Sequence, residues 1–102
     1  MIAEFSVTPV GSGVSVGAQV AKAVRIVRDS GLKYELNPMG TVVEGTWDEV
    51  MAVIKACNDA LLKDCERLSI LIKIDSRRGP APPMEEKVRS VMERVGRQRG
   101  PA

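Results

Sequence analysis

Two carboxylates and an amide lie close together in the first half of this chain. They are Glu35, Asn37 and Glu44. Asn37 begins the short segment at residues 37–40, and the two glutamates lie on either side of it. Carboxylate oxygens accept hydrogen bonds and an amide both donates and accepts them, so such a set can hold a small polar molecule. A hairpin with a purely structural role has no need of these side chains. The spacing therefore indicates a small-molecule site.

The segment at residues 37–40 reads Asn-Pro-Met-Gly, which is typical of a tight turn. Proline presets φ at the second position, asparagine bonds to its own backbone, and glycine accepts a positive φ. We therefore expect a hairpin whose strands are residues 33–37 and 41–45.

The register of this hairpin decides where Glu44 lies, and the residues leave two alternatives open. A two-residue turn pairs Gly40 with Asn37, and Glu44 then shares a sheet face with Glu35. A bulge at Gly40 turns Glu44 to the face of Tyr34 instead. There the carboxylate needs a partner, because an unpaired buried charge is costly.

Hydrophobic patterning predicts five further elements. Alternation of apolar and polar residues indicates strands at residues 2–10 and 67–75. Apolar residues at helical spacing indicate helices at residues 15–30, 46–64 and about 83–95. The first two of these helices begin at a serine and a threonine that can cap them.

The core must be largely aliphatic, because the chain has only three aromatic residues, Phe5, Tyr34 and Trp47. Strand parity directs Phe5 and Tyr34 toward the helices. Helical spacing directs Trp47 inward with the apolar residues of the helix that it begins. A chain of 102 residues is long enough for one such core without disulfides or a structural metal.

The order of these elements is strand, helix, two strands, helix, strand and helix. It is typical of the ferredoxin-like α+β fold, a four-stranded antiparallel sheet, here with an additional C-terminal helix. Right-handed crossovers place the first two helices on one sheet face and leave the other face uncovered. The single domain is predicted to span residues 1–96, with Gly96 ending the last helix, and residues 97–102 are predicted to form a flexible tail.

The uncovered face of the sheet carries most of the candidate polar residues. Ser6 and Thr8 lie on it and join the candidate site. Ile2 and Leu71 add apolar area, and a second subunit is the simplest cover, so a homodimer or homotetramer is expected. Strand parity assigns to this face Ile2, Glu4, Ser6, Thr8, Glu35, Asn37, Ser69, Leu71, Lys73 and Asp75.

Composition argues against several function classes. The chain has no histidine, which removes His-based triads and His-ligated metals. Its two cysteines, Cys57 and Cys65, form no CxxC pair, so we expect free thiols and a cytoplasmic location. No apolar run approaches about 20 residues and no signal peptide is recognisable, so no membrane partner is expected.

Two further classes find little support in the residues. The net charge is only +2 and the uncovered face offers no aromatic platform for bases, so no nucleic-acid partner is expected. Acylphosphatases share the predicted topology but need an arginine in the first loop, and residues 9–13 contain none. The chain is therefore not expected to be an enzyme, and an acylphosphatase-like hydrolase is the minor alternative.

Four segments of the chain carry a family resemblance. They are residues 2–7 (Ile-Ala-Glu-Phe-Ser-Val), 30–41, 44–45 (Glu-Gly) and 73–77 (Lys-Ile-Asp-Ser-Arg). In these segments the chain resembles the MTH1187-like (UPF0045, DUF77) thiamine-binding family, over nearly all of residues 1–95. The resemblance implies a ferredoxin-like subunit, assembly into dimers or tetramers, no firmly attached catalytic activity, and binding of thiamine or its hydroxymethylpyrimidine part.

The ligand that this resemblance implies suits the candidate residues. Thiamine is a cation with an aminopyrimidine, which needs an acceptor for its amino group and a donor for a ring nitrogen. Glu35 and Asn37 can supply these, and each charge-assisted hydrogen bond contributes about 1.5–3 kcal/mol. Met39 offers a soft contact to a ring. The candidate ligand-binding residues are Glu35, Asn37, Met39, Glu44, Ser6 and Thr8, with no metal and no required cofactor.

The alternative to a thiamine binder is a structural or regulatory oligomer that does not bind thiamine. Both alternatives need self-association, and they differ only in whether the polar residues around the turn hold a ligand.

Overall fold

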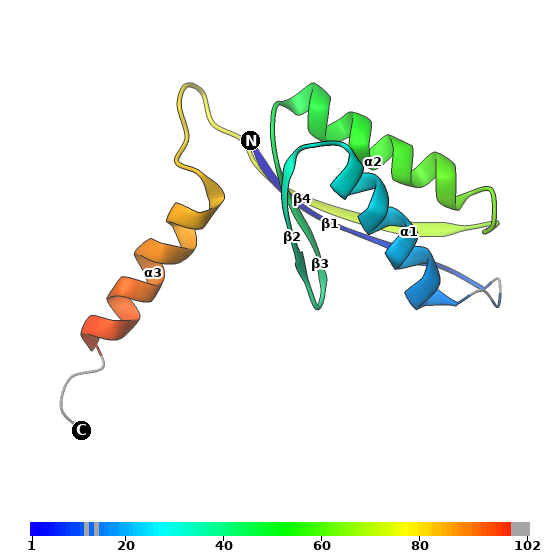
Figure 1. Ribbon diagram of the computed structural model, residues 1–102, viewed down its shortest axis with the longest axis horizontal. Helices are drawn as coiled ribbons and strands as arrows, with labels where there is room; N and C mark the ends of the chain where they lie inside the picture. Colours follow the sequence, from blue (N-terminus) through cyan, green and yellow to red (C-terminus); the bar gives the residue numbers. More distant parts are fainter. Residues whose placement is uncertain (12, 14, 99–102) are drawn as a thin grey trace.

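The computed structural model describes residues 1–11, 13 and 15–98 of the chain. Figure 1 shows seven elements in the predicted order. They are β1 (Ile2–Pro9), α1 (Val16–Asp29), β2 (Lys33–Asn37), β3 (Gly40–Glu44), α2 (Trp47–Leu61), β4 (Leu68–Asp75) and α3 (Met84–Gln98).

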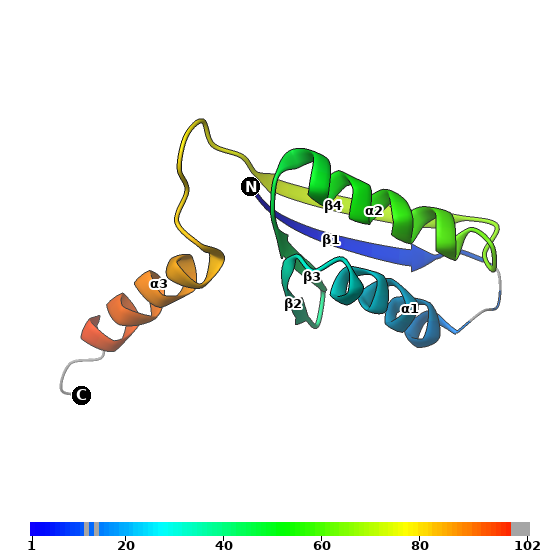
Figure 2. The same cartoon turned by 45° about the horizontal axis from the view of Figure 1, so that its top comes forward.

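The four strands form one sheet in the order β2-β3-β1-β4, and every neighbouring pair is antiparallel. α1 and α2 pack beside each other on one face of this sheet, as the turned view in Figure 2 shows. The predicted ferredoxin-like α+β fold is confirmed. The opposite sheet face has no helix of the described chain lying across it (Figures 1 and 2), and we call it the open face.

Local signals explain where the first two helices begin and end. The Ser15 side chain accepts a hydrogen bond from the Ala18 backbone and caps α1. Thr46 and Glu49 exchange side-chain and backbone hydrogen bonds in a capping box at the start of α2. The backbone bond from Thr46 also lowers the pKa of Glu49 below its ordinary value. Gly31, with a φ of 78°, follows α1 and turns the chain toward β2.

The core lies between the helices and the sheet and is almost entirely aliphatic. Trp47 is an exception to the predicted pattern, because 54% of it is exposed. It is the first residue of α2 and lies a turn ahead of the residues by which that helix reaches the core. The buried core residues are Ala3, Phe5, Val7, Ala23, Val27, Val43, Val50, Val53, Ile54, Cys57 and Leu61.

The hairpin has the tighter of its two possible registers. Gly40 pairs with Asn37, and Lys33 pairs with Glu44, so no bulge interrupts β3. Glu44 therefore lies on the open face together with Glu35. The φ of Gly40 is not positive. A glycine fits here because β3 lies close to β1: a Cβ at this position would lie 3.0 Å from the carbonyl oxygen of Phe5.

The third helix differs from its prediction at both ends. It begins at Met84 and continues through Gly96 to Gln98, so residues 97–98 are helical rather than part of the tail. A glycine in an exposed helix costs only about 1 kcal/mol relative to alanine, which is too little to end α3 by itself. The rest of the predicted tail, residues 99–102, lies outside the described residues.

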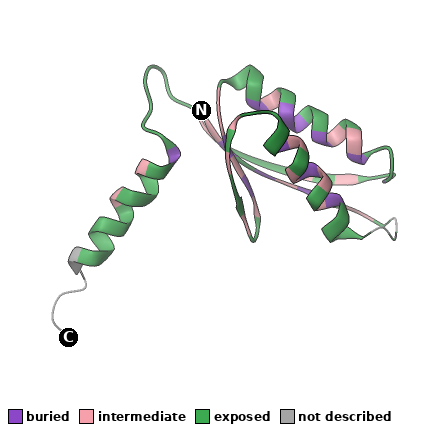
Figure 3. Ribbon diagram, in the orientation of Figure 1, coloured by how far each residue is buried: buried purple, intermediate pink, exposed green. Residues whose placement is uncertain are grey.

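α3 projects away from the sheet and its two packed helices (Figures 1 and 2). The radius of gyration is 16.2 Å, whereas a compact chain of this length has about 13 Å. Figure 3 shows that most of the helix is exposed; Met84 is buried, and Glu86 and Ser90 are half-buried. Within the described part of the chain, α3 therefore packs only at its first turns, and the rest of the helix has no packing surface.

We expect Gly40→Ala to destabilise the protein by about 1–2 kcal/mol, because the new methyl group would press on the backbone of Phe5. The matched control is Gly17→Ala in the first turn of α1, where a Cβ meets no atom closer than 4.0 Å. That control should be stabilising by about 0.5–1 kcal/mol. Urea unfolding measures both, and an unchanged stability of Gly40→Ala would contradict the close approach of β3 to β1.

Candidate functional site

A cleft of about 380 Å³ opens between α1, the end of β1 and the tip of the β2–β3 hairpin. This volume lies within the roughly 300–1,000 Å³ that is usual for small-molecule sites. The lining residues are Phe5, Ser6, Val7, Thr8, Val16, Val20, Ala23, Val24, Leu36, Asn37, Pro38, Met39, Gly40, Thr41 and Leu71.

The cleft exists because β3 is shorter than β1. β4 pairs with β1 along its whole length, from Ile2 to Pro9. β3 pairs with β1 only as far as Phe5. Within the described part of the chain, no strand pairs with the other side of residues 6–9. Alternate backbone groups of this free edge point into the gap and can bond a ligand.

One wall of the cleft is apolar. Val16, Val20 and Val24 of α1 line it at helical spacing, and Leu36 of β2 lies on the same side of the sheet. Val16 is 50% exposed and Leu36 is 57% exposed, so this wall is open to a ligand rather than closed over a core. Such a surface suits the flat face of a ring.

The polar groups of the cleft come from β1 and the hairpin. Ser6, Thr8, Asn37 and Met39, four of the six predicted site residues, all line it. Met39 is 86% exposed and stands at the rim. The structure therefore brings together residues that are about 30 positions apart in the sequence.

Glu35 does not line the cleft, but it lies near it on the open face. It faces Val42 across the hairpin, and Val42 in turn faces Glu4 on β1. The Glu4 side chain lies against Gly40, since its Cγ would be 3.3 Å from a Cβ built there. Glu4 and Glu35 therefore place two carboxylates on the open face next to the hairpin tip.

Glu44 lies at the other end of the hairpin and holds the start of α3. The Met84 backbone N–H donates to its Oε1 atom at 3.0 Å, and its Oε2 atom lies 3.2 Å from Lys33 Nζ. Lys33 also bonds Glu85, which lowers the pKa of Glu85 below its ordinary value. A carboxylate at a helix N-terminus is favourable because it faces the positive end of the helix dipole.

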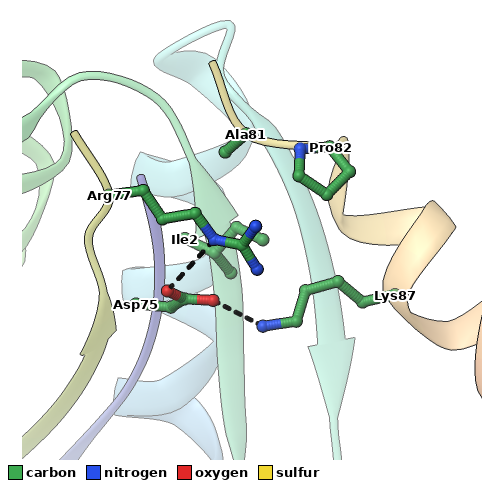
Figure 4. A pocket seen from close by; sticks show the side chains of 6 residues that line it. All are labelled: Ile2, Asp75, Arg77, Ala81, Pro82 and Lys87. Atoms are coloured by element: carbon green, nitrogen blue, oxygen red, sulfur yellow. Dashed lines mark hydrogen bonds and ion pairs between the residues drawn. The ribbon is translucent and has the colours of Figure 1, made fainter. Parts of the chain in front are cut away.

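A second contact fixes the same end of α3. Figure 4 shows the Asp75 carboxylate between Lys87, whose Nζ lies 2.5 Å away, and Arg77, whose Nε lies 3.9 Å away. The hydrogen bond from Lys87 lowers the pKa of Asp75. The enclosed space, also bounded by Ile2 and Pro82, has a volume of about 10 Å³, room for about one water molecule. This junction is a structural joint and has no room for a ligand.

The described residues contain no group of three or more His, Cys, Asp or Glu side chains that could hold a metal ion. None of the described helices is long and apolar enough to span a bilayer. Cys57 and Cys65 are both buried free thiols, and burial raises the pKa of Cys57 to about 11. Cys57 is therefore protonated and unreactive at neutral pH.

Comparison with known proteins identifies the family. The sequence profile of the family described as "Thiamine-binding protein" matches residues 3–92. The chain belongs to the thiamine-binding protein family. This confirms the resemblance that the four sequence segments indicate.

Relatives of this thiamine-binding protein family member cover nearly its whole length. UPF0045 protein MT1949 of Mycobacterium tuberculosis is 46% identical over 92 residues, which are 89% of this chain and 90% of the relative. The crystal structure of MJ1052 from Methanocaldococcus jannaschii has a TM-score of 0.81 at 37% identity, covering 90% of this chain and 95% of that one.

A third relative carries a more specific description. The structure of a candidate thiamine biosynthesis/salvage protein from Thermotoga maritima has a TM-score of 0.79 at 27% identity. The match covers 88% of this chain and 96% of that one. The thiamine-binding protein family thus shares the fold seen here across distant organisms.

Sequence reasoning alone does not identify several residues of this family member's cleft. The α1 valines have the spacing of an ordinary core stripe, and only the early end of β3 makes them a cleft wall. Strand parity predicts Glu4 on the open face. Its place beside Gly40 follows from the hairpin register, which the sequence leaves open.

The joint of α3 is expected to depend on pH. The pKa values of Asp75 and Glu85 are lowered in the folded protein. Their ion pairs therefore stabilise the joint fully above the pKa values of the unfolded chain, about 3.9 and 4.3. This stabilisation is lost as the pH falls through the lower pKa values of the folded protein. Hydrogen exchange of the Met84 amide, followed from pH 6 to pH 3, should therefore accelerate below about pH 4 beyond the intrinsic rate.

A core amide, that of Val27, serves as the control for global unfolding, because this residue is fully buried. Asp75→Asn should already weaken protection of Met84 at pH 6. Constant protection of Met84 down to pH 3, with the Val27 amide also protected, would contradict an ionic joint.

Proposed function

We propose that this protein binds thiamine, or its hydroxymethylpyrimidine part, in the cleft between α1, β1 and the hairpin tip. The observation that carries the proposal is the convergence of Ser6, Thr8, Asn37 and Met39 on one cleft of ligand size. Membership of the thiamine-binding protein family supports the choice of ligand. The description of the Thermotoga maritima relative agrees with it.

The cleft offers the hydrogen bonds that an aminopyrimidine needs. The Asn37 amide has an acceptor for the exocyclic amino group and a donor for a ring nitrogen. The hydroxyls of Ser6 and Thr8 and the free backbone edge of β1 supply further partners. The α1 valines face one side of the ring. With two or three such bonds and ring burial, a micromolar dissociation constant, about −8 kcal/mol, is a reasonable expectation.

The charge of the ligand also fits the surroundings of the cleft. Thiamine carries a positive thiazolium ring, and Glu4 and Glu35 stand on the open face beside the hairpin tip. Among the described residues, neither carboxylate takes part in an ion pair. Their negative charge attracts a cation toward the rim, and Lys73, which faces Glu4 across the β1–β4 pair, offsets part of it.

The role of Glu44 as a direct ligand residue is the least supported part of the predicted site. Its two carboxylate oxygens are engaged by Met84 and Lys33, at the hairpin end opposite the turn. We therefore propose that the ligand contacts Asn37 at one end of the hairpin and that Glu44 holds α3 at the other.

We propose binding rather than catalysis as the activity of the protein, in the cytoplasm and without a required cofactor. The loop at residues 9–13 contains no arginine that could cradle a phosphate. Two reduced cysteines suit a reducing compartment. We also propose that the protein works as an oligomer, because the described part of the chain leaves the open face and most of α3 without cover.

Isothermal titration calorimetry of the purified protein with thiamine tests the proposed function. We expect micromolar binding for the native chain and an affinity about tenfold weaker for Asn37→Ala, which loses a donor and an acceptor. The matched control is Asn58→Ala, which removes an amide from α2, whose residues do not line the cleft. This control should bind like the native protein.

A second variant tests the position of the ligand by blocking the cleft without removing a hydrogen-bonding group. Val20→Phe places a ring into the cleft from α1 and should abolish the heat of thiamine binding while the fold persists. Absence of heat for the native protein with thiamine, thiamine phosphates and hydroxymethylpyrimidine would overturn the ligand and favour a structural or regulatory oligomer.

A further inference from the structure

The hydrogen bonds of β1 show which of its backbone groups face the cleft. The Val10 N–H donates to the Arg67 carbonyl at 2.9 Å, and this bond continues the β1–β4 register by one residue. In an antiparallel ladder the N–H and C=O of one residue point to the same side, and successive residues alternate. The even-numbered residues of β1 therefore bond β4, and the odd-numbered residues point to the side of β3.

The other end of β1 gives the same assignment. The Gly45 N–H donates to the Met1 carbonyl at 3.0 Å, and this bond continues the β1–β3 register by one residue. Odd-numbered residues thus bond β3 as far as β3 extends, and the last such pair is Phe5 with Thr41. Because both ends of the strand agree, the direction of every backbone group between them follows.

Val7 is the first residue of β1 whose backbone meets the gap beyond β3. It lies two positions after Phe5, so its N–H and its C=O both point to the side where β3 has ended, as Figure 2 helps to follow. Val7 lines the cleft, although its side chain is buried in the core. Neither ladder of the described chain supplies a partner for these two groups. A donor and an acceptor therefore lie next to each other in the cleft.

Pro9 limits what can use this strand edge. It is the next residue of β1 that points to the same side, it is the last residue of the strand, and it has no N–H. On this part of the described edge a foreign strand would therefore find one donor, at Val7, before the edge ends. A small ring that needs one donor and one acceptor is a better match.

An aminopyrimidine carries the complementary pair of groups. Its ring nitrogen accepts a hydrogen bond, and the amino group on the neighbouring carbon donates one. At Val7 the N–H donates to the ring nitrogen and the C=O accepts from the amino group. The ring then continues the plane of the sheet, and one of its faces meets Val20 and Val24 of α1. The second ring nitrogen and the second amino hydrogen remain for Asn37.

We propose that the backbone of Val7 recognises the amino edge of the ligand and makes the cleft specific for flat rings with an amino group next to a ring nitrogen. This inference rests on the proposed function, because it names the group that selects the ligand in the same cleft. An oxo group in place of the amino group reverses the pattern, since the ring nitrogen then carries a hydrogen. At Val7 a donor would face a donor and an acceptor would face an acceptor.

A side-chain amide cannot make this distinction. Asn37 can turn its amide over and present a donor where it presented an acceptor. The backbone of Val7 cannot turn, because Ser6 and Thr8 on either side of it are bonded to β4. Discrimination between an amino and an oxo ring therefore separates recognition by Val7 from recognition by Asn37.

Competition calorimetry with thiamine and oxythiamine, its analogue with an oxo group in place of the amino group, tests the inference. We expect the native chain to bind oxythiamine at least about 100-fold more weakly, because two hydrogen bonds are lost and like groups are brought together. Asn37→Ala should weaken the binding of both compounds and keep the preference for thiamine. Equal affinities in the native chain, or loss of the preference in Asn37→Ala, would overturn the inference.

Hydrogen exchange followed by NMR locates the contact without any substitution. In the free protein the Val7 amide should exchange much faster than the amides of Phe5 and Thr8, which bond β3 and β4. Saturating thiamine should slow the Val7 amide at least about 100-fold more than the Thr8 amide, the matched control one residue away. Slow exchange of Val7 in the free protein, or no added protection with thiamine, would contradict recognition by this backbone.

The two measurements also separate this inference from the proposed function. If neither thiamine nor hydroxymethylpyrimidine binds, the proposed function fails and the inference falls with it. If thiamine binds and oxythiamine binds equally well, the proposed function stands and only the role of Val7 is wrong.

Discussion

The β2–β3 hairpin turns over only two residues, and this turn limits how far β3 extends along β1. Because Gly40 pairs with Asn37, β3 contacts β1 only as far as Phe5, while β4 follows β1 to its end. The second half of β1 is therefore a sheet edge that lies inside the outline of the domain. α1 passes over this gap with valine and alanine side chains, which are too small to fill the space of a missing strand. The cleft, its apolar wall and its backbone partners all follow from this difference in strand length.

An unpaired strand edge has a cost, since its N–H and C=O groups need water or another partner. It is also a hazard, because a foreign strand can pair with it. Pro38 and Met39 at the hairpin tip line the cleft beside this edge. The remaining space of about 380 Å³ suits a small planar molecule better than a peptide strand. This chain thus has a ligand-sized gap where a longer hairpin would have continued the sheet.

Most of the fold could be predicted from the sequence, because each element carries its own local signal, and the caps at Ser15 and Thr46 are examples. Gly96 misled the prediction because a glycine alone does not end a helix. Parity placed Ser6, Thr8 and Asn37 on one face, but it could not reveal a cleft. The cleft depends on where β3 stops, and that depends on a register which sequence periodicity leaves open. The same limit applies to every residue whose role is set by a neighbouring strand rather than by its own.

The hairpin also connects the cleft with the first turn of α3. Its turn end carries Asn37 at the cleft, and its other end carries Lys33 and Glu44, which hold the first turn of α3. A five-residue β-ladder joins these ends and leaves little freedom between them. Because this joint sets the direction of α3, one short β-ladder connects the cleft with the base of the third helix.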